Sequence, residues 1–310
     1  MSKELKKQTF LLTGWLLLIF TLMGCSSQTE QTNIDQKLQL IEKIKPNSEN
    51  TIELFIKEAK GGKEELYKTI NDGYLSHYHS LENKNGNLYI IRRTGDTSGP
   101  DNNWSDELWR YTPQREEFKI YSTAGLDFRV ASDEKTIVIT QGEENQLIFL
   151  TNTGKELRRY SVKDFITGKE SKNFSPGIRL LKWSDDNKTF WGALFETIST
   201  ETIFSIDLST WQVQRYSITN LPIGAELELN ANKALLLYSD YPVFLDVDAA
   251  KEFEGSKKKV DLYIYNLKNQ SQQVIATSIS QKFNPHWIDN DIIEFTELNG
   301  KVRQKSILFD

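Results

Sequence analysis

The sequence contains little cysteine, little histidine and no excess of basic residues. Its 310 residues include one cysteine, Cys25, and three histidines. A single thiol cannot form an intramolecular disulfide. The formal net charge is -5 at pH 7, whereas a protein that binds the phosphate backbone of a nucleic acid needs a basic surface. We therefore expect no disulfide scaffold, no nucleic-acid partner and no bound cofactor.

Long apolar runs are also scarce, and the clearest one lies near the N-terminus. Three lysines occur within residues 1–10, and residues 10–24 then read FLLTGWLLLIFTLMG. This run is shorter than the ~20 apolar residues of a spanning helix. A basic start, a short apolar centre and a small residue at the end are typical of a secretory signal. We predict a signal peptide at 1–24, with an uncleaved anchor as the alternative.

The end of this segment resembles a bacterial lipobox. The tetrapeptide Leu22-Met23-Gly24-Cys25 has Leu at −3, Gly at −1 and Cys at +1, although Met23 is larger than the residue usual at −2. The resemblance implies cleavage before Cys25 and attachment of a diacylglyceryl group, which carries fatty acids such as palmitate, to its sulfur. It also implies a location on the extracytoplasmic face of the cell membrane. The small polar residues that follow suit a lipidated tether at 25–33.

Residues 34–46 precede the main domain and have a helical pattern. Ile34, Leu38, Ile41 and Ile44 recur at helical spacing, and Pro46 ends the run. This spacing predicts a short amphipathic helix that packs on the domain.

From residue 51 onward, apolar residues alternate with polar ones and polar turns separate short runs. The clearest unit spans 177–218, in which an apolar lead-in ends at Trp183 and a turn follows at 184–188. Three strand-like runs complete the unit, at 189–195, 202–208 and 212–218. Similar units occupy 74–122, 126–162 and 223–277, and partial units occupy 51–70 and 281–310.

These units recur at a regular distance. The first apolar residues after the turns are Leu88, Ile137, Phe190, Leu235 and Ile292, which lie about 50 residues apart. A four-stranded unit with a period of roughly 40–50 residues is typical of a β-propeller. We predict an all-β propeller over 51–310. If the two partial units share one blade, strands from both termini close a ring of five blades; if each stands alone, there are six.

Two turn segments resemble those of TolB-like propellers. Residues 183–188 (WSDDNK) and 285–290 (PHWIDN) are similar to the P-x-W-S-P-D-G turn, and 207–210 (DLST) is similar to the D-L-x-T that ends a third strand. The second Pro and the Gly of the family motif are missing from both turns. The likeness covers 74–310 and implies a propeller; such domains occur in binding proteins, in assembly scaffolds and as gates over peptidase domains. The whole chain also resembles surface lipoproteins of Gram-positive bacteria.

The three histidines are candidate ligand contacts. His77 and His79 lie in an expected innermost strand, where period 2 places them on one face. His286 lies in the expected innermost strand of the last unit, so ring closure brings all three near the central channel. A three-histidine metal site is chemically reasonable, but packing or ligand-contact roles are favoured, and we predict no metal.

Two long insertions connect the second and third strands of their units, so both should emerge on one face of the ring. Residues 94–107 form an expected polar loop with the candidate ligand-binding residues Asp96, Asp101, Trp104 and Asp106. A calcium loop needs Gly where Asp106 stands, and a merely solvated loop is the other alternative. Insertions confined to one face often mark the binding face of a repeat protein. The second insertion spans 240–259.

No catalytic constellation stands out. The acids at 185–186 recur as a turn type, and the G-x-S-x-G motif of α/β-hydrolases is absent. We expect a non-enzymatic, lipid-anchored binding or assembly module that recognises a protein or peptide on the face carrying the insertions. The alternative is carbohydrate or small-ligand binding in the central channel, with glycoside hydrolysis as an extension of it.

Overall fold

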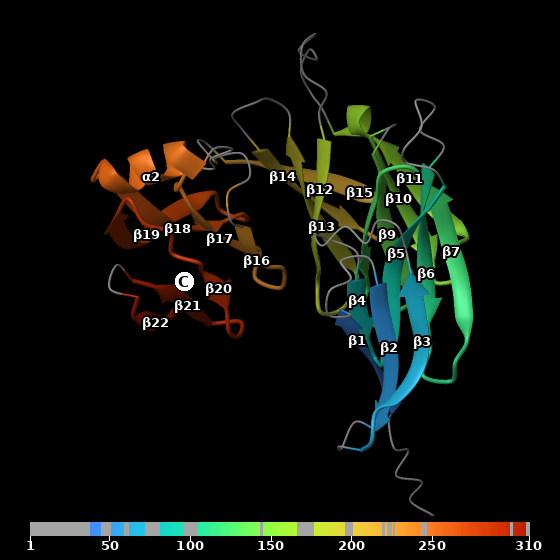
Figure 1. The fold of residues 1–310 in the computed structure, drawn as a ribbon. Helices are drawn as coiled ribbons and strands as arrows, with labels where there is room; N and C mark the ends of the chain where they lie inside the picture. Colours follow the sequence, from blue (N-terminus) through green and yellow to red (C-terminus); the bar gives the residue numbers. More distant parts are fainter. Residues whose placement is uncertain are drawn as a thin grey trace, which may run out of the picture.

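The computed structural model shows a nearly all-β chain. It describes residues 38–44, 51–58, 62–71, 81–95, 104–142, 145–165, 177–195, 201–218, 221, 225, 227–242, 247–297 and 300–307. These residues form six antiparallel sheets of three or four strands each. The sheets follow one another in chain order along an arc (Figure 1), and we number them first to sixth.

The first sheet contains β1 (Leu38–Ile44), β2 (Thr51–Glu58) and β3 (Glu65–Asn71). The second contains β4 (Leu81–Lys84), β5 (Asn87–Gly95), β6 (Trp104–Tyr111) and β7 (Glu117–Thr123). The third contains β8 (Leu126–Val130), β9 (Thr136–Gln141), β10 (Gln146–Thr151) and β11 (Glu156–Ser161), followed by the short helix η1 (Val162–Asp164). The fourth contains β12 (Gly177–Trp183), β13 (Thr189–Phe195), β14 (Glu201–Asp207) and β15 (Gln212–Ser217).

The fifth sheet contains β16 (Leu227–Asn230), β17 (Leu235–Ser239), β18 (Lys259–Asn266) and β19 (Ser271–Ile279), with helix α2 (Val247–Gly255) between β17 and β18. The sixth contains β20 (His286–Trp287), β21 (Ile292–Thr296) and β22 (Val302–Ser306). No helix in the described part of the chain is long and apolar enough to cross a membrane.

Apolar side chains fill the spaces between neighbouring sheets. One cluster joins the third and fourth sheets through residues such as Phe149, Tyr160, Trp183 and Phe190. Because the second to fifth sheets have a neighbouring sheet on each side, a second strand can be buried along its whole length, as β17 is. Stacking of this kind is how four-stranded units bury two apolar faces.

The turn residues connect adjacent sheets. Trp183 of the fourth sheet donates its indole N–H to the carbonyl of Arg129 in the third, at 3.2 Å, and Trp287 of the sixth donates to the carbonyl of Glu228 in the fifth, at 3.1 Å. The backbone N–H of Ser132 donates to Asn187 Oδ1 at 2.9 Å. These equivalent bonds show that the recurring tryptophan and turn residues hold the sheets together.

The predicted helix at 34–46 is wrong, because residues 38–44 form strand β1. β1 pairs with β2 along its full length, and Leu40 lies opposite Ile56. Leu40 is fully buried, its N–H donates to Gly86 O at 3.2 Å, and its carbonyl accepts from Asn83 Nδ2 at 2.8 Å. Tertiary pairing therefore overrides a helical spacing that only a short segment supports.

The predicted blade shared by the two chain ends is also not formed. Strands β1–β3 make their own sheet and β20–β22 make another, and Figure 1 shows the first and sixth sheets lying apart. The physical reason is β1, which supplies the lead-in strand that the sequence interpretation did not find for residues 51–70. Six sheets are found, while the number of blades and the closure of the ring stay predictions.

Candidate functional site

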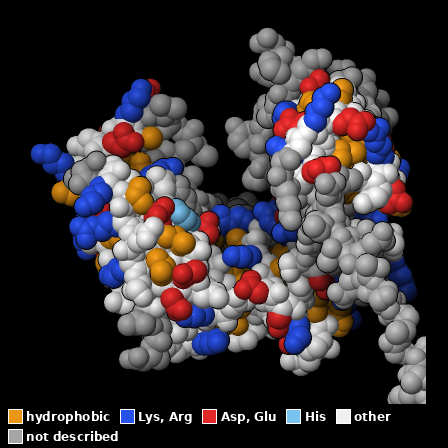
Figure 2. Space-filling view, turned by 90° about the horizontal axis from the view of Figure 1, so that it is seen from below, with side chains coloured by type: hydrophobic (Ala, Val, Ile, Leu, Met, Phe, Trp, Pro, Cys, Tyr) orange, Lys and Arg blue, Asp and Glu red, His pale blue; other side chains and the backbone are white. Residues whose placement is uncertain are grey.

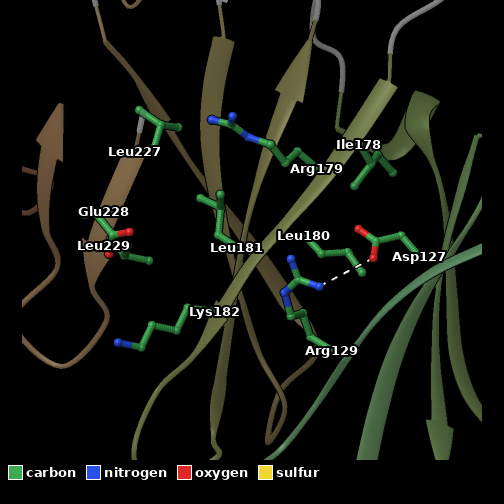
Figure 3. Close-up of a pocket in the computed structure, with 10 residues that line it drawn as sticks. All are labelled: Asp127, Arg129, Ile178, Arg179, Leu180, Leu181, Lys182, Leu227, Glu228 and Leu229. Atoms are coloured by element: carbon green, nitrogen blue, oxygen red, sulfur yellow. Dashed lines mark hydrogen bonds and ion pairs between the residues drawn. The ribbon is translucent and has the colours of Figure 1, made fainter. Parts of the chain in front are cut away.

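The first strands of three consecutive sheets line a cavity of about 440 Å³. Ten residues line it (Figure 3): Asp127, Arg129, Ile178, Arg179, Leu180, Leu181, Lys182, Leu227, Glu228 and Leu229. They come from β8, β12 and β16, which are the lead-in strands of the third, fourth and fifth sheets. The cavity therefore lies where the central channel of a propeller is expected.

Strand alternation places the charged side chains of β8 on the wall of the cavity. Leu126, Phe128 and Val130 are buried between sheets, whereas Asp127 and Arg129 are only half-buried and line the cavity. Arg129 Nη1 donates to Phe128 O at 2.6 Å and to Asp127 Oδ1 at 3.4 Å. These bonds fix the guanidinium beside β12.

Two further basic residues extend from β12. Figure 3 shows Arg179 and Lys182 projecting on the side of β16. Arg179 Nη1 donates to the carbonyl of Ala225 at 3.4 Å. Lys182 is exposed and forms no hydrogen bond or ion pair with the rest of the described chain. Figure 2 shows lysine and arginine side chains gathered near the middle of the face seen from below.

A carboxylate from the second sheet lies behind this wall. Glu82 accepts a hydrogen bond from the backbone N–H of Val130 at 3.0 Å, and it lies 3.8 Å from Arg129 Nε. Burial raises the pKa of Glu82, although the Val130 N–H and the nearby Lys84 and Arg129 partly offset the effect. Glu82 therefore positions Arg129 and offsets part of its charge, and the two basic residues of β12 are the other cations of the cavity wall.

The first insertion is shorter than predicted, because residues 104–107 belong to β6 and not to a loop. Asp96 and Asp101 lie outside the described residues. Asp106 is 3 % exposed, and it accepts from Arg93 Nε at 2.8 Å, from Arg93 Nη2 at 3.2 Å and from the Leu126 N–H at 3.2 Å. Trp104 lies against the Arg93 guanidinium, 4.0 Å from ring centroid to Cζ. These two side chains form a structural cluster, and their predicted ligand contacts stay a prediction.

The second insertion contains a helix that the sequence interpretation missed. Residues 247–255 form α2, and Phe253 packs edge-on against Tyr241 with ring centroids 5.3 Å apart. In the sequence, two alanines and one aromatic residue at helical spacing were the only indication of this helix. A pattern of nine residues is too short to distinguish a helix from a loop.

The predicted meeting of three histidines stays a prediction. His77 and His79 lie outside the described residues. His286 is in β20 and lies 3.2 Å from Glu294 Oε1, with half of its side chain exposed. Within the described ranges, no group of three or more histidine, cysteine, aspartate or glutamate side chains could hold a metal ion.

The acids at the turn of the fourth sheet have structural partners. Asp186 Oδ1 accepts from Ser184 Oγ at 2.7 Å and from the Lys188 N–H at 3.1 Å, and these bonds hold the pKa of Asp186 below its usual value. Asp185 bonds Asn232 of the next sheet. This pattern is that of turn caps, as the recurrence of such turns predicted.

Comparisons with known proteins identify a fold. No protein-family model matches the chain, and curated protein sequences show no significant match. Among solved structures, oligogalacturonate lyase from Vibrio parahaemolyticus has a TM-score of 0.54 and 15% identity, over 83% of this chain and 74% of that one. Tricorn protease has a TM-score of 0.50 and 11% identity, over 87% of this chain and 28% of that one. TolB from Acinetobacter baumannii has a TM-score of 0.44 and 11% identity, over 86% and 62%. The chain therefore has the fold of β-propeller proteins.

Proposed function

We propose that the protein is a binding module whose central channel takes an anionic ligand. The observation that supports this most is the cavity formed by β8, β12 and β16, which receives Arg129, Arg179 and Lys182 from two adjacent strands. Two acids also line it, but one of them, Asp127, lies 3.4 Å from Arg129. Arginine and lysine side chains gathered on one wall favour carboxylate or phosphate groups. This choice follows the channel alternative of the sequence interpretation.

Binding explains the described geometry better than catalysis does. A general acid–base pair needs titratable groups within reach of the reacting atoms. Glu82 is placed behind Arg129 and bonded to backbone, and Asp127 is held by the same arginine. An uronate oligosaccharide is a suitable anionic probe, because the similar lyases are named for oligogalacturonate.

The test is a calorimetric titration of the folded protein with trigalacturonate. We expect binding to the wild type and at least about tenfold weaker binding to Lys182→Ala, because a lost charged contact costs about 1.5–3 kcal/mol. Lys251→Ala is the matched control, since this exposed lysine lies on α2 away from the channel wall. Equal affinity of wild type and Lys182→Ala for trigalacturonate contradicts the proposal.

We also propose that the module is anchored through Cys25 at the extracytoplasmic face of the membrane. The lipobox-like residues 22–25 support this. We expect Cys25→Ala to abolish labelling with radioactive palmitate and to leave the chain unprocessed or released from membranes. Unchanged lipid labelling of Cys25→Ala contradicts it. Recognition of a protein or peptide on the face carrying the insertions remains a second prediction for the same anchored module.

A further inference from the structure

The spaces between adjacent sheets are filled differently at equivalent positions. Strand register makes Phe149 of β10 equivalent to Ser205 of β14. Phe149 precedes Leu150, which pairs with Ile137, the first apolar residue of β9. Ser205 likewise precedes Ile206, which pairs with Phe190, the first apolar residue of β13. A large aromatic side chain in the third sheet therefore corresponds to a small hydroxyl in the fourth.

Between the third and fourth sheets this position is filled by aromatic rings. Phe149 is fully buried, and its ring centroid lies 5.3 Å from that of Trp211, 5.8 Å from Phe190 and 6.1 Å from Trp183. Trp211 reaches this place from the β14–β15 turn, where its φ is 59°. No space for a ligand is expected in such a cluster.

Between the fourth and fifth sheets the equivalent residues are not aromatic. Leu229 pairs with Leu236 as Trp183 pairs with Phe190. Gln270, with φ of 57°, stands in the β18–β19 turn as Trp211 stands in the β14–β15 turn. Together with Ser205, these replacements remove three of the rings that fill the preceding interface. A groove of about 910 Å³ lies between the two sheets.

The groove has an aromatic floor and a polar rim. Trp191 and Tyr216 are buried and stacked, with ring centroids 5.4 Å apart and an interplanar angle of 28°. The Tyr216 hydroxyl lies 3.3 Å from Ser205 Oγ. Within the described chain, the indole N–H of Trp191 has no hydrogen-bond partner although the side chain is only 4 % exposed. The floor therefore consists of two stacked rings and a buried donor that has no partner within the described residues.

The rim supplies carboxamides. Gln212 and Gln214 are two residues apart on β15, so their side chains lie on the same face of the strand. Both side chains are exposed, and neither forms a hydrogen bond within the described chain. Asp207 keeps its charge, because its Oδ1 accepts from the hydroxyl of Ser209 and from the N–H groups of Ser209 and Thr210 at 2.7 and 3.0 Å, and these bonds hold its pKa below the usual value. Two further charged residues line the groove: Arg215 of β15 and the exposed Lys268 of the fifth sheet.

We infer that this groove is a second binding site, specific for a neutral, hydroxyl-rich ligand such as a saccharide. Carboxamides donate and accept at once, as hydroxyl groups require, and aromatic faces pack against the C–H faces of sugar rings. The groove differs from the channel in chemistry, because three cations and two carboxylates line the channel, whereas amides, hydroxyls and rings outnumber the charged residues that line the groove. It is also independent of the channel, since no residue lines both.

The experiment uses maltotriose, cellotriose and chitotriose as neutral probes with the full folded protein. Binding is followed by quenching of tryptophan fluorescence and by saturation-transfer NMR at up to millimolar concentration. We expect at least one probe to bind, the double variant Gln212→Ala/Gln214→Ala to bind it at least about tenfold more weakly, and Ser205→Phe to lose binding because the added ring fills the groove as Phe149 does.

The matched control is Gln272→Ala/Gln273→Ala, which removes two exposed glutamines from the outer strand of the fifth sheet and should keep wild-type affinity. Lys182→Ala should also keep it, which separates this site from the channel. If Ser205→Phe fails to fold, the glutamine pair decides alone, because those side chains are exposed. Binding of none of the three probes, or unchanged binding by the double variant, overturns the inference.

Discussion

Glu82 shows how a buried charge on an inner strand affects stability. Its side chain is 17% exposed, and burial raises its pKa in the folded protein. The folded state therefore holds the Glu82 proton more tightly than the unfolded state does, so ionisation of this group lowers stability as pH rises through the folded pKa.

We expect Glu82→Gln to raise the unfolding midpoint at pH 7, because the amide can still accept from the Val130 N–H without carrying a buried charge. The gain should shrink as pH falls toward 4.5, where Glu82 itself becomes neutral. Thermal unfolding of both proteins across this range measures the effect. Glu156→Gln is the control of opposite sign, since a bond from Arg159 lowers the pKa of Glu156. A constant difference between Glu82→Gln and wild type at all pH values contradicts the account.

The sequence interpretation did not single out the channel residues, because nothing in their own positions along the strands distinguishes them. Asp127, Arg129 and Lys182 alternate with apolar residues along short strands. The same alternation is expected of any strand with one solvated face. Only the packing of three inner strands around one cavity distinguishes these charges from ordinary surface ones.

At the scale of single elements, strands flanked by clear turns were predictable. The runs expected at 189–195, 202–208 and 212–218 are found as β13, β14 and β15 to within one residue at each end. Their turns contain residues such as Asn187 at φ of 57°, a conformation that asparagine tolerates well. Elements whose conformation depends on a distant partner were not predictable, and β1 is the clearest case.

Substitutions in β1 distinguish the strand from the predicted helix. Leu40 is 1 % exposed, whereas Ile41 is only half-buried. In the strand, Leu40→Ala should cost about 2–5 kcal/mol through cavity formation, and Ile41→Ala should cost less. A helix with Ile41 in its apolar stripe gives the reverse order. Urea unfolding of the two variants decides between them.

For the whole molecule, the repeat period predicted the propeller architecture better than it predicted how the two ends of the chain are arranged. The spacing of about 50 residues corresponds to the second to sixth sheets, which have the topology expected of blades. The number of sheets depended on β1, which supplies the first sheet with its own inner strand. Solved structures with TM-scores of 0.50 to 0.54 share this propeller fold at 11 to 15% identity, so the likeness shows the fold and not the residues of a site.

The central claim is that an anionic ligand binds between the inner strands, and a crystal structure of the protein with trigalacturonate tests it most directly. The account predicts ligand density between β8, β12 and β16, with carboxylate oxygens within hydrogen-bond distance of Lys182 and at least one of Arg129 and Arg179. Density confined to the face that carries the insertions, or an empty channel at saturating ligand, would contradict it.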